Sequence, residues 1–130
     1  MKRKSIKRTW NDLTIPERED MIKNQSIVYR VAMQMGKLTY KAYNITRNNF
    51  VHSGVLELKD IDTDAIEIHS LYNRTPDKYQ SFGVNDIFLS KESAIMYLIE
   101  RCDIHDTDMI DDKTMKEMKL FMKNNPYYLI

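Results

Sequence analysis

The sequence predicts an α+β fold, in which a small twisted antiparallel sheet or a partly closed β-barrel is followed by helices. Three observations predict it. Apolar and polar residues alternate with a period of two through much of the segment from Ile27 to Leu71, and after Phe88 the period becomes that of a helix. The length of 130 residues suffices for one hydrophobic core and not for two. We therefore expect a single domain over residues 14–130, preceded by a flexible basic arm over residues 1–13.

The first expected helix covers residues 15–24. Thr14 and Glu17 have the spacing of a capping box, in which each side chain accepts a hydrogen bond from the other residue's backbone N–H. Pro16 suits the first turn, where its missing N–H costs nothing. Because this helix carries few apolar side chains, it must pack against its own sheet or against another protein.

The sheet is expected within residues 26–89 and should contain about five strands, as alternation and turn residues indicate. Met35 and Gly36 match a two-residue hairpin turn of type II′, in which Gly36 takes the positive φ. The strands are expected at residues 27–35, 37–46, 55–58, 65–71 and 84–89, with a long polar loop before the last of them.

Two helices are expected after the sheet, over residues 91–102 and 112–124. Ser90 can cap the first of them, whose apolar residues recur at helical spacing. Asp111 and Asp112 stand at the start of the second, where carboxylates stabilise the positive end of the helix dipole. Pro126 follows its end.

Charge is distributed unevenly, although the net charge is only +1. Five cations occupy the first eight residues, so the rest of the chain carries 15 basic against 19 acidic residues, a net charge of about −4. The arm could neutralise phosphates of a nucleic acid, and the acidic patch could meet a basic partner. The arm residues are Lys2, Arg3, Lys4, Lys7 and Arg8, and the patch residues are Asp103, Asp106, Asp108, Asp111 and Asp112.

The sequence contains no recognisable catalytic motif, metal-ligand set or phosphate loop. The acidic patch lacks the glycine and the distal glutamate of an EF-hand loop. We therefore expect a protein that is not an enzyme, with no cofactor and no metal. A small enzyme with an unfamiliar site remains an alternative, which would require a pocket that unites Asp103, His105 or His69 with a second carboxylate.

No apolar stretch is long enough to span a membrane, and the basic start is not followed by the apolar segment of a secretory signal. We therefore expect a cytoplasmic protein that does not contact membranes.

The candidate contacts with a protein partner are large apolar and aromatic residues near the two ends of the chain. Interfaces use such side chains, especially on elements with little cover of their own. Three methionines recur at helical spacing in the last helix and could form an adaptable docking stripe, with core filling as the alternative. The candidates are Trp10, Leu13, Met115, Met118, Met122, Tyr127 and Tyr128.

Three motifs occur in a definite order along the chain. They are Val28-Tyr29-Arg30-Val31, then Gly36-Lys37 with Tyr40-Lys41-Ala42-Tyr43, and finally Ile87-Phe88-Leu89-Ser90-Lys91-Glu92-Ser93-Ala94. Over about half the chain, this order resembles small, mostly uncharacterised accessory proteins of tailed bacteriophages of the T4 type. The resemblance implies a curled sheet or small β-barrel with an appended helix, and no catalytic residues. It also implies a setting, since such proteins often bind and redirect a host enzyme such as RNA polymerase or a defence nuclease.

The leading expectation is a non-enzymatic, phage-encoded binding protein that modulates a host protein complex in the host cytoplasm. The runner-up is a nucleic-acid-binding β-barrel module that uses the basic arm and one face of the sheet. The sequence leaves the oligomeric state open.

Overall fold

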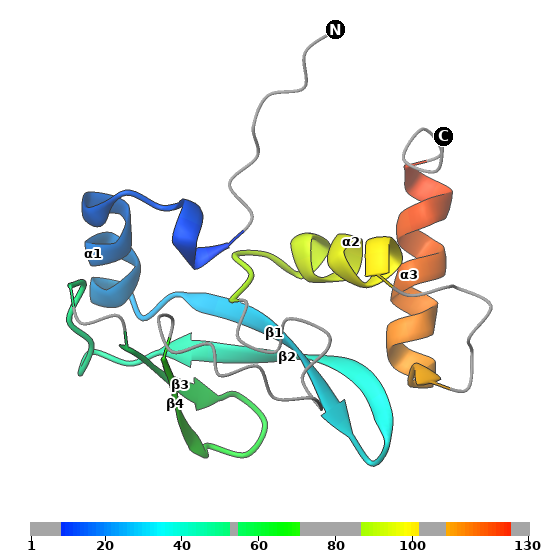
Figure 1. Cartoon of the computed structure of the whole chain (residues 1–130), viewed down its shortest axis with the longest axis horizontal. Helices are drawn as coiled ribbons and strands as arrows, with labels where there is room; N and C mark the ends of the chain where they lie inside the picture. The colour runs from blue at the N-terminus through cyan, green and yellow to red at the C-terminus, as the bar shows by residue number, and fades with distance from the viewer. Residues whose placement is uncertain (1–8, 53–54, 71–86, 102–108, 126–130) are drawn as a thin grey trace, which may run out of the picture.

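A computed structural model of the chain describes residues 9–52, 55–70, 87–101 and 109–125 and confirms the α+β class (Figure 1). An N-terminal helix precedes an open antiparallel sheet, and two helices follow the sheet. In chain order the elements are η1 (Trp10–Asp12), α1 (Ile15–Lys23), β1 (Ile27–Gln34), β2 (Lys37–Ile45), β3 (Val55–Asp60), β4 (Ile66–Ser70), α2 (Lys91–Arg101) and α3 (Asp112–Asn124).

The sheet has the strand order β1-β2-β3-β4, and each strand is antiparallel to the next. It does not close into a barrel. The fifth strand predicted at residues 84–89 is represented, in the described part of the chain, by Phe88. Its backbone exchanges two hydrogen bonds of 2.8 Å with Tyr29 on the outer edge of β1. Residues 84–86 lie outside the described ranges.

The turn between β1 and β2 differs from the expected type. Met35 and Gly36 both have positive φ angles, of 53° and 79°, so the turn is of type I′ rather than II′. A type I′ turn matches the right-handed twist of the two long strands, and this match favours it although Met35 must enter the left-handed region.

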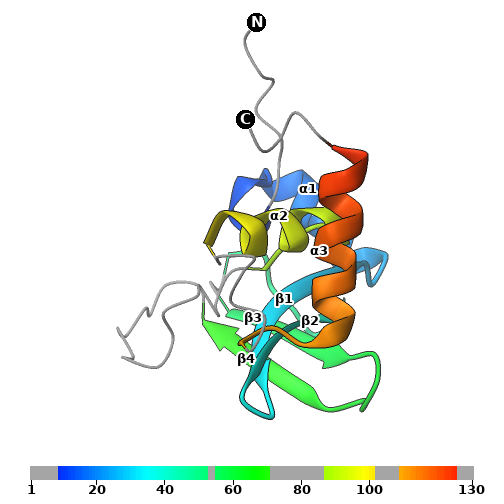
Figure 2. The same ribbon diagram turned by 90° about the vertical axis from the view of Figure 1, so that its right-hand side faces the viewer.

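Two hydrophobic clusters hold the domain together. In the first, α2 packs on β1 and α3 on β2 (Figure 2), with Phe88 and Tyr97 in ring contact at 5.1 Å between centroids. The buried members of this first cluster are Val31, Leu38, Phe88, Ala94, Ile95, Tyr97, Leu98, Ile110, Met115 and Met118. The second cluster joins η1 and α1 to the sheet, and its buried members are Trp10, Val28, Tyr43, Ile45, Leu56, Leu58 and Ile87.

The boundary of the arm needs correction, because residues 9–13 belong to the domain. The Trp10 side chain is only 4% exposed, and its backbone N–H donates to the Ile87 carbonyl at 2.9 Å. Arg18 covers the indole, with its guanidinium carbon 5.5 Å from the ring centroid, and donates from Nε to the Trp10 carbonyl. A tryptophan buries enough apolar area to anchor a short segment of this kind. Residues 1–8 lie outside the described ranges.

Candidate functional site

Three of the seven predicted partner contacts are buried, which corrects their assignment to an exposed surface. Trp10, Met115 and Met118 are core residues, because η1 and the last helix seal against the sheet instead of standing apart from it. Leu13 and Met122 are half-buried. Tyr127 and Tyr128 lie outside the described residues.

The two charged segments contribute little to the described surface. Asp111 is the N-cap of α3, and its carboxylate accepts from the Thr114 N–H at 2.8 Å. Asp112 is exposed in the first turn of the same helix. The other members of the acidic patch and the basic arm, namely Asp103, Asp106, Asp108, Lys2, Arg3, Lys4, Lys7 and Arg8, lie outside the described ranges.

The most unusual part of the described surface is one face of the β3–β4 hairpin. Directly paired residues in an antiparallel sheet place their side chains on the same face. The register therefore puts Ile66 beside Lys59 and Ile68 beside Glu57 on one face, and Val55 lies on that face two residues before Glu57. Lys59 pairs with Asn44 on β2, and Asn44 pairs with Ile27 on β1, so Ile27 lies on the same face at the opposite side of the sheet. We call Ile27, Val55, Ile66 and Ile68 the outer apolar face. All four are exposed, Ile66 to 53% and Ile68 to 68%.

The side chains of Glu67 and His69 lie on the opposite face of β4, which faces the interior. Glu67 accepts a hydrogen bond of 2.8 Å from Nη1 of Arg30, which is buried. Nη1 of Arg30 also donates to the Tyr43 hydroxyl at 3.4 Å. His69 Nε2 lies 3.4 Å from the same Glu67 oxygen. β4 thus turns its polar side chains inward and its isoleucines outward, which reverses the usual arrangement.

Burial dominates the electrostatics of this inner polar cluster. It lowers the pKa of His69 to about 4, and the Arg30 cation acts in the same direction. Burial also raises the pKa of Tyr43 well above its usual value. At neutral pH the cluster therefore contains a neutral imidazole and a neutral phenol beside the Arg30–Glu67 ion pair.

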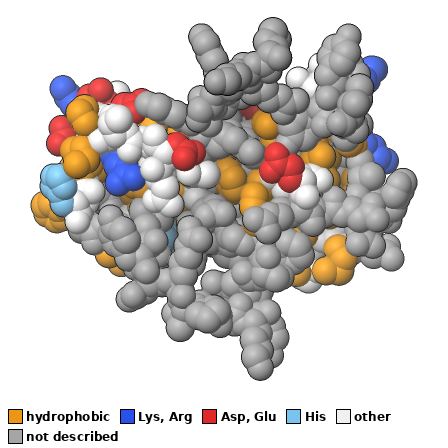
Figure 3. All heavy atoms as spheres, turned by 45° about the horizontal axis from the view of Figure 1, so that its top comes forward, with side chains coloured by type: hydrophobic (Ala, Val, Ile, Leu, Met, Phe, Trp, Pro, Cys, Tyr) orange, Lys and Arg blue, Asp and Glu red, His pale blue; other side chains and the backbone are white. Residues whose placement is uncertain are grey.

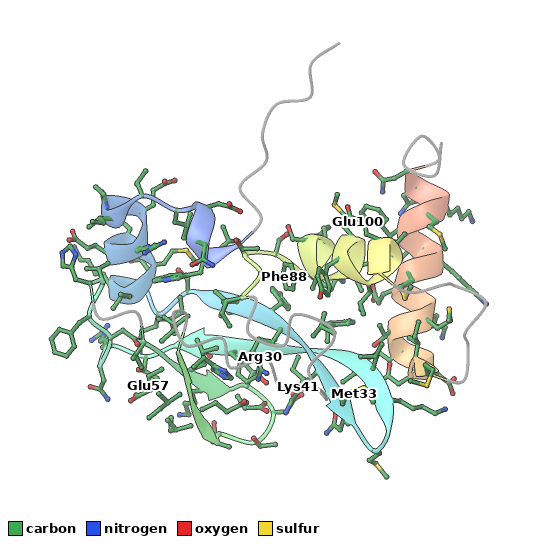
Figure 4. All side chains as sticks on the ribbon, viewed as in Figure 1. Arg30, Met33, Lys41, Glu57, Phe88 and Glu100 are labelled. Carbon is green, nitrogen blue, oxygen red and sulfur yellow. The ribbon has the colours of Figure 1, made fainter. Side chains whose placement is uncertain are left out.

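A second ion pair lies next to the inner polar cluster. Lys41 pairs with Asp60, which is almost fully buried, and the register places Lys41 beside Arg30 (Figure 4). Burial alone would raise the pKa of Asp60. Hydrogen bonds from Lys41 and from the Asp62 amide outweigh that effect and hold the pKa below its usual value. Each ion pair supplies an opposite charge to one buried group, Arg30 in the first pair and Asp60 in the second.

The enzyme alternative requires a histidine beside a second carboxylate. His69 does lie beside Glu67, and its imidazole is largely buried. Asp103 and His105 lie outside the described ranges. The described residues contain no group of three or more side chains that could hold a metal ion. Among the same residues, no helix has the length and apolarity needed to cross a bilayer.

The edge of β4 offers backbone hydrogen bonds next to the outer apolar face. The Glu57 N–H donates to Asn49 Oδ1 at 2.6 Å, and the Glu57 carbonyl accepts from the Thr46 N–H, so both peptide groups point toward β2. In an antiparallel pair, the residue opposite then directs its own peptide groups the other way. The N–H and carbonyl of Ile68 consequently point to the outer edge of β4, with which no strand of the described residues pairs.

Sequence reasoning found the alternation in β4 but missed this surface. The signal was present as an Ile-Glu-Ile-His pattern from Ile66 to His69, which does not reveal which face is buried.

The chain matches no family model, no curated protein and no solved structure.

Proposed function

We propose that this chain is a non-enzymatic binding protein that acts by protein–protein contact through the outer apolar face and through the edge of β4 that no described strand covers. The observation that supports this most is the pair of exposed isoleucines on a strand whose other face carries Glu67, paired with buried Arg30, and the largely buried His69. Single exposed apolar residues are common on proteins and need no explanation. Ile66 and Ile68 lie together on one face of β4, beside an edge with which no described strand pairs, and this combination is typical of a surface that another chain covers.

The partner that suits this surface is a protein segment in extended conformation. Such a segment would pair with the peptide groups of Ile68 and place alternate side chains against Ile66 and Ile68, as in strand addition to a sheet edge. Glu57 and Lys59 lie beside Ile68 and Ile66 on β3, one strand further from this edge, so the added strand would contact β4 itself.

The setting that we propose follows from the resemblance to accessory proteins of T4-type bacteriophages. In that setting the chain would be phage-encoded and would modulate a host protein complex, such as RNA polymerase or a defence enzyme, in the host cytoplasm. A protein with a small core and an exposed strand edge suits this role, because it needs only one surface to occupy a functional site on a larger assembly.

A site-specific cross-linking experiment tests the proposal. A photoreactive phenylalanine analogue replaces Ile68 in the full chain, and a matched variant carries it at Leu120, which is exposed on α3, away from the sheet edge. We expect a discrete cross-linked protein in bacterial cells only with the analogue at Ile68. Mass spectrometry then identifies it, and the purified pair is used for calorimetry.

In the purified pair, Ile68→Lys should weaken binding at least tenfold, whereas Leu120→Lys should leave it unchanged. Both side chains are exposed, so circular dichroism should show that both variants fold. Equal affinities of the Ile68→Lys variant and the unaltered protein would refute the proposal. Loss of affinity by several orders of magnitude between low and moderate salt would instead favour the nucleic-acid alternative, in which phosphate contacts dominate.

A further inference from the structure

An open hollow of about 780 Å³ lies between the C-terminal end of α1 and the loop that joins β2 to β3. Its volume falls in the range of small-ligand and peptide pockets. Ile22 and Val51, both half-buried, and Phe50, which is 77% exposed, supply the apolar part of its lining. At the left of Figure 3, where α1 and this loop lie, apolar side chains stand beside basic and acidic ones and a histidine. None of its lining residues belongs to the outer apolar face.

Hydrogen bonds fix both walls of the hollow. α1 ends in a Schellman motif, in which the Ser26 N–H donates to the Met21 carbonyl at 3.0 Å and the Gln25 N–H to the Ile22 carbonyl at 3.1 Å. In the loop, the Asn49 amide group donates to the Glu57 carbonyl at 3.0 Å and accepts from the Glu57 N–H. These bonds hold the end of α1 and Asn49 before any ligand arrives, so binding costs little ordering of the chain at these residues.

The charge of the lining favours an anion. Lys23 and Arg47 are exposed at the hollow, and neither forms an ion pair with a described residue. Glu19 is the acidic residue of the lining. Two cations against one carboxylate leave a positive rim around an apolar floor, which complements an apolar group that carries a negative charge.

We propose that this hollow binds an acidic peptide segment of a partner protein. An aromatic or apolar side chain of the peptide would pack on Ile22, Phe50 and Val51, and carboxylates beside it would lie at Lys23 and Arg47. A peptide suits the site better than a nucleic acid does, since two cations with a carboxylate among them do not match a chain of phosphates. The hollow and the β4 edge share no residue, so this proposal stands or falls separately from the proposed function.

Nuclear magnetic resonance on the full chain of 15.5 kDa can test the proposal with defined peptides. The probe is acetyl-Asp-Phe-Glu-amide, and its uncharged counterpart is acetyl-Asn-Phe-Gln-amide, which has the same shape. Millimolar acidic peptide should shift the backbone amides of Lys23, Arg47 and Val51. The uncharged peptide should bind at least fivefold more weakly, because it lacks both carboxylates.

Two pairs of variants separate the charged and apolar parts of the site. Arg47→Gln should weaken the acidic peptide about threefold, which corresponds to roughly 0.6 kcal/mol, and Lys119→Gln on α3 should not change its affinity. Phe50→Ala should weaken both peptides, unlike Leu120→Ala. The proposal is overturned if the two peptides bind equally, if these amides do not respond, or if a thymidine hexanucleotide binds them more tightly than the acidic peptide.

Discussion

Truncation of Met118 to alanine gives the most direct test of how the last helix is used. The Met118 side chain has no exposed surface and belongs to the cluster between α2, α3 and the sheet. Replacing a buried methionine by alanine costs about 2–5 kcal/mol through lost apolar burial and the cavity that remains. Alanine is a slightly better helix former, which offsets a few tenths of a kcal/mol at most. We therefore expect a loss of about 2–4 kcal/mol in the free energy of unfolding.

Urea denaturation measures this loss with two probes. Domains of this size lose about 1–3 kcal/mol of stability per molar urea, so the midpoint should fall by roughly 1–2 M. The chain has one tryptophan, and Trp10 lies in the other hydrophobic cluster. If both clusters unfold together, Trp10 fluorescence and far-ultraviolet circular dichroism should shift by the same amount.

Leu120→Ala is the matched control, because Leu120 lies on the same helix with 52% of its surface exposed. Its midpoint should change by less than the equivalent of about 0.5 kcal/mol. A Met118→Ala midpoint equal to that of Leu120→Ala would show that this methionine is not a core residue. A shift in circular dichroism without one in Trp10 fluorescence would show that the two clusters unfold separately.

Three further predictions concern individual residues. Asp60→Asn should destabilise the domain by about 2–4 kcal/mol at neutral pH, since Lys41 loses its buried partner. The pKa of the Asp60 carboxylate is lowered, so its contribution to the free energy of unfolding is complete above pH 3.8 and is lost at lower pH. The free energies of unfolding of wild type and variant, measured by urea titration, should converge at that lower pH. Gln25 has a φ of 48°, so Gln25→Gly should stabilise by about 0.5–1 kcal/mol in thermal melts, whereas Glu19→Gly inside α1 should destabilise by about 0.5 kcal/mol. The His69 ring should titrate near pH 4 when followed by nuclear magnetic resonance. The free energy of unfolding that depends on its neutral form should be lost as the pH falls from 6.5 through 4. A titration midpoint near 6.5 would contradict the burial of His69 beside Arg30.

Local sequence chemistry predicted the helices and most strands. The capping box at α1 is present as expected, with the Thr14 N–H donating to Glu17 Oε1 at 2.9 Å and the Glu17 N–H to Thr14 Oγ1 at 3.4 Å. Asp111 is the N-cap of α3, where its carboxylate accepts a single hydrogen bond from the Thr114 N–H at 2.8 Å. These contacts join residues three positions apart, so the sequence contains all the information that they require.

Burial was harder to predict, because it depends on residues far apart in the chain. The methionines of α3 could have faced solvent or the sheet, and it is Leu38 and Val31, more than seventy residues earlier, that make them core residues. Neither Trp10 nor its acceptor Ile87 identifies the other in the sequence. Helical spacing alone cannot distinguish a core stripe from a docking stripe.

The Arg30–Glu67 pair explains why β4 exposes its isoleucines. A shift of one residue in the pairing of β4 would turn Ile66 and Ile68 inward, which the hydrophobic effect favours, and would move Glu67 to the outside. That shift would take this carboxylate away from Arg30, whose side chain is only 7% exposed, and loss of the ion pair opposes the shift. The inner pair thus opposes the register that would hide the outer apolar face. A fold that retains this ion pair on one side of β4 keeps Ile66 and Ile68 exposed on the other.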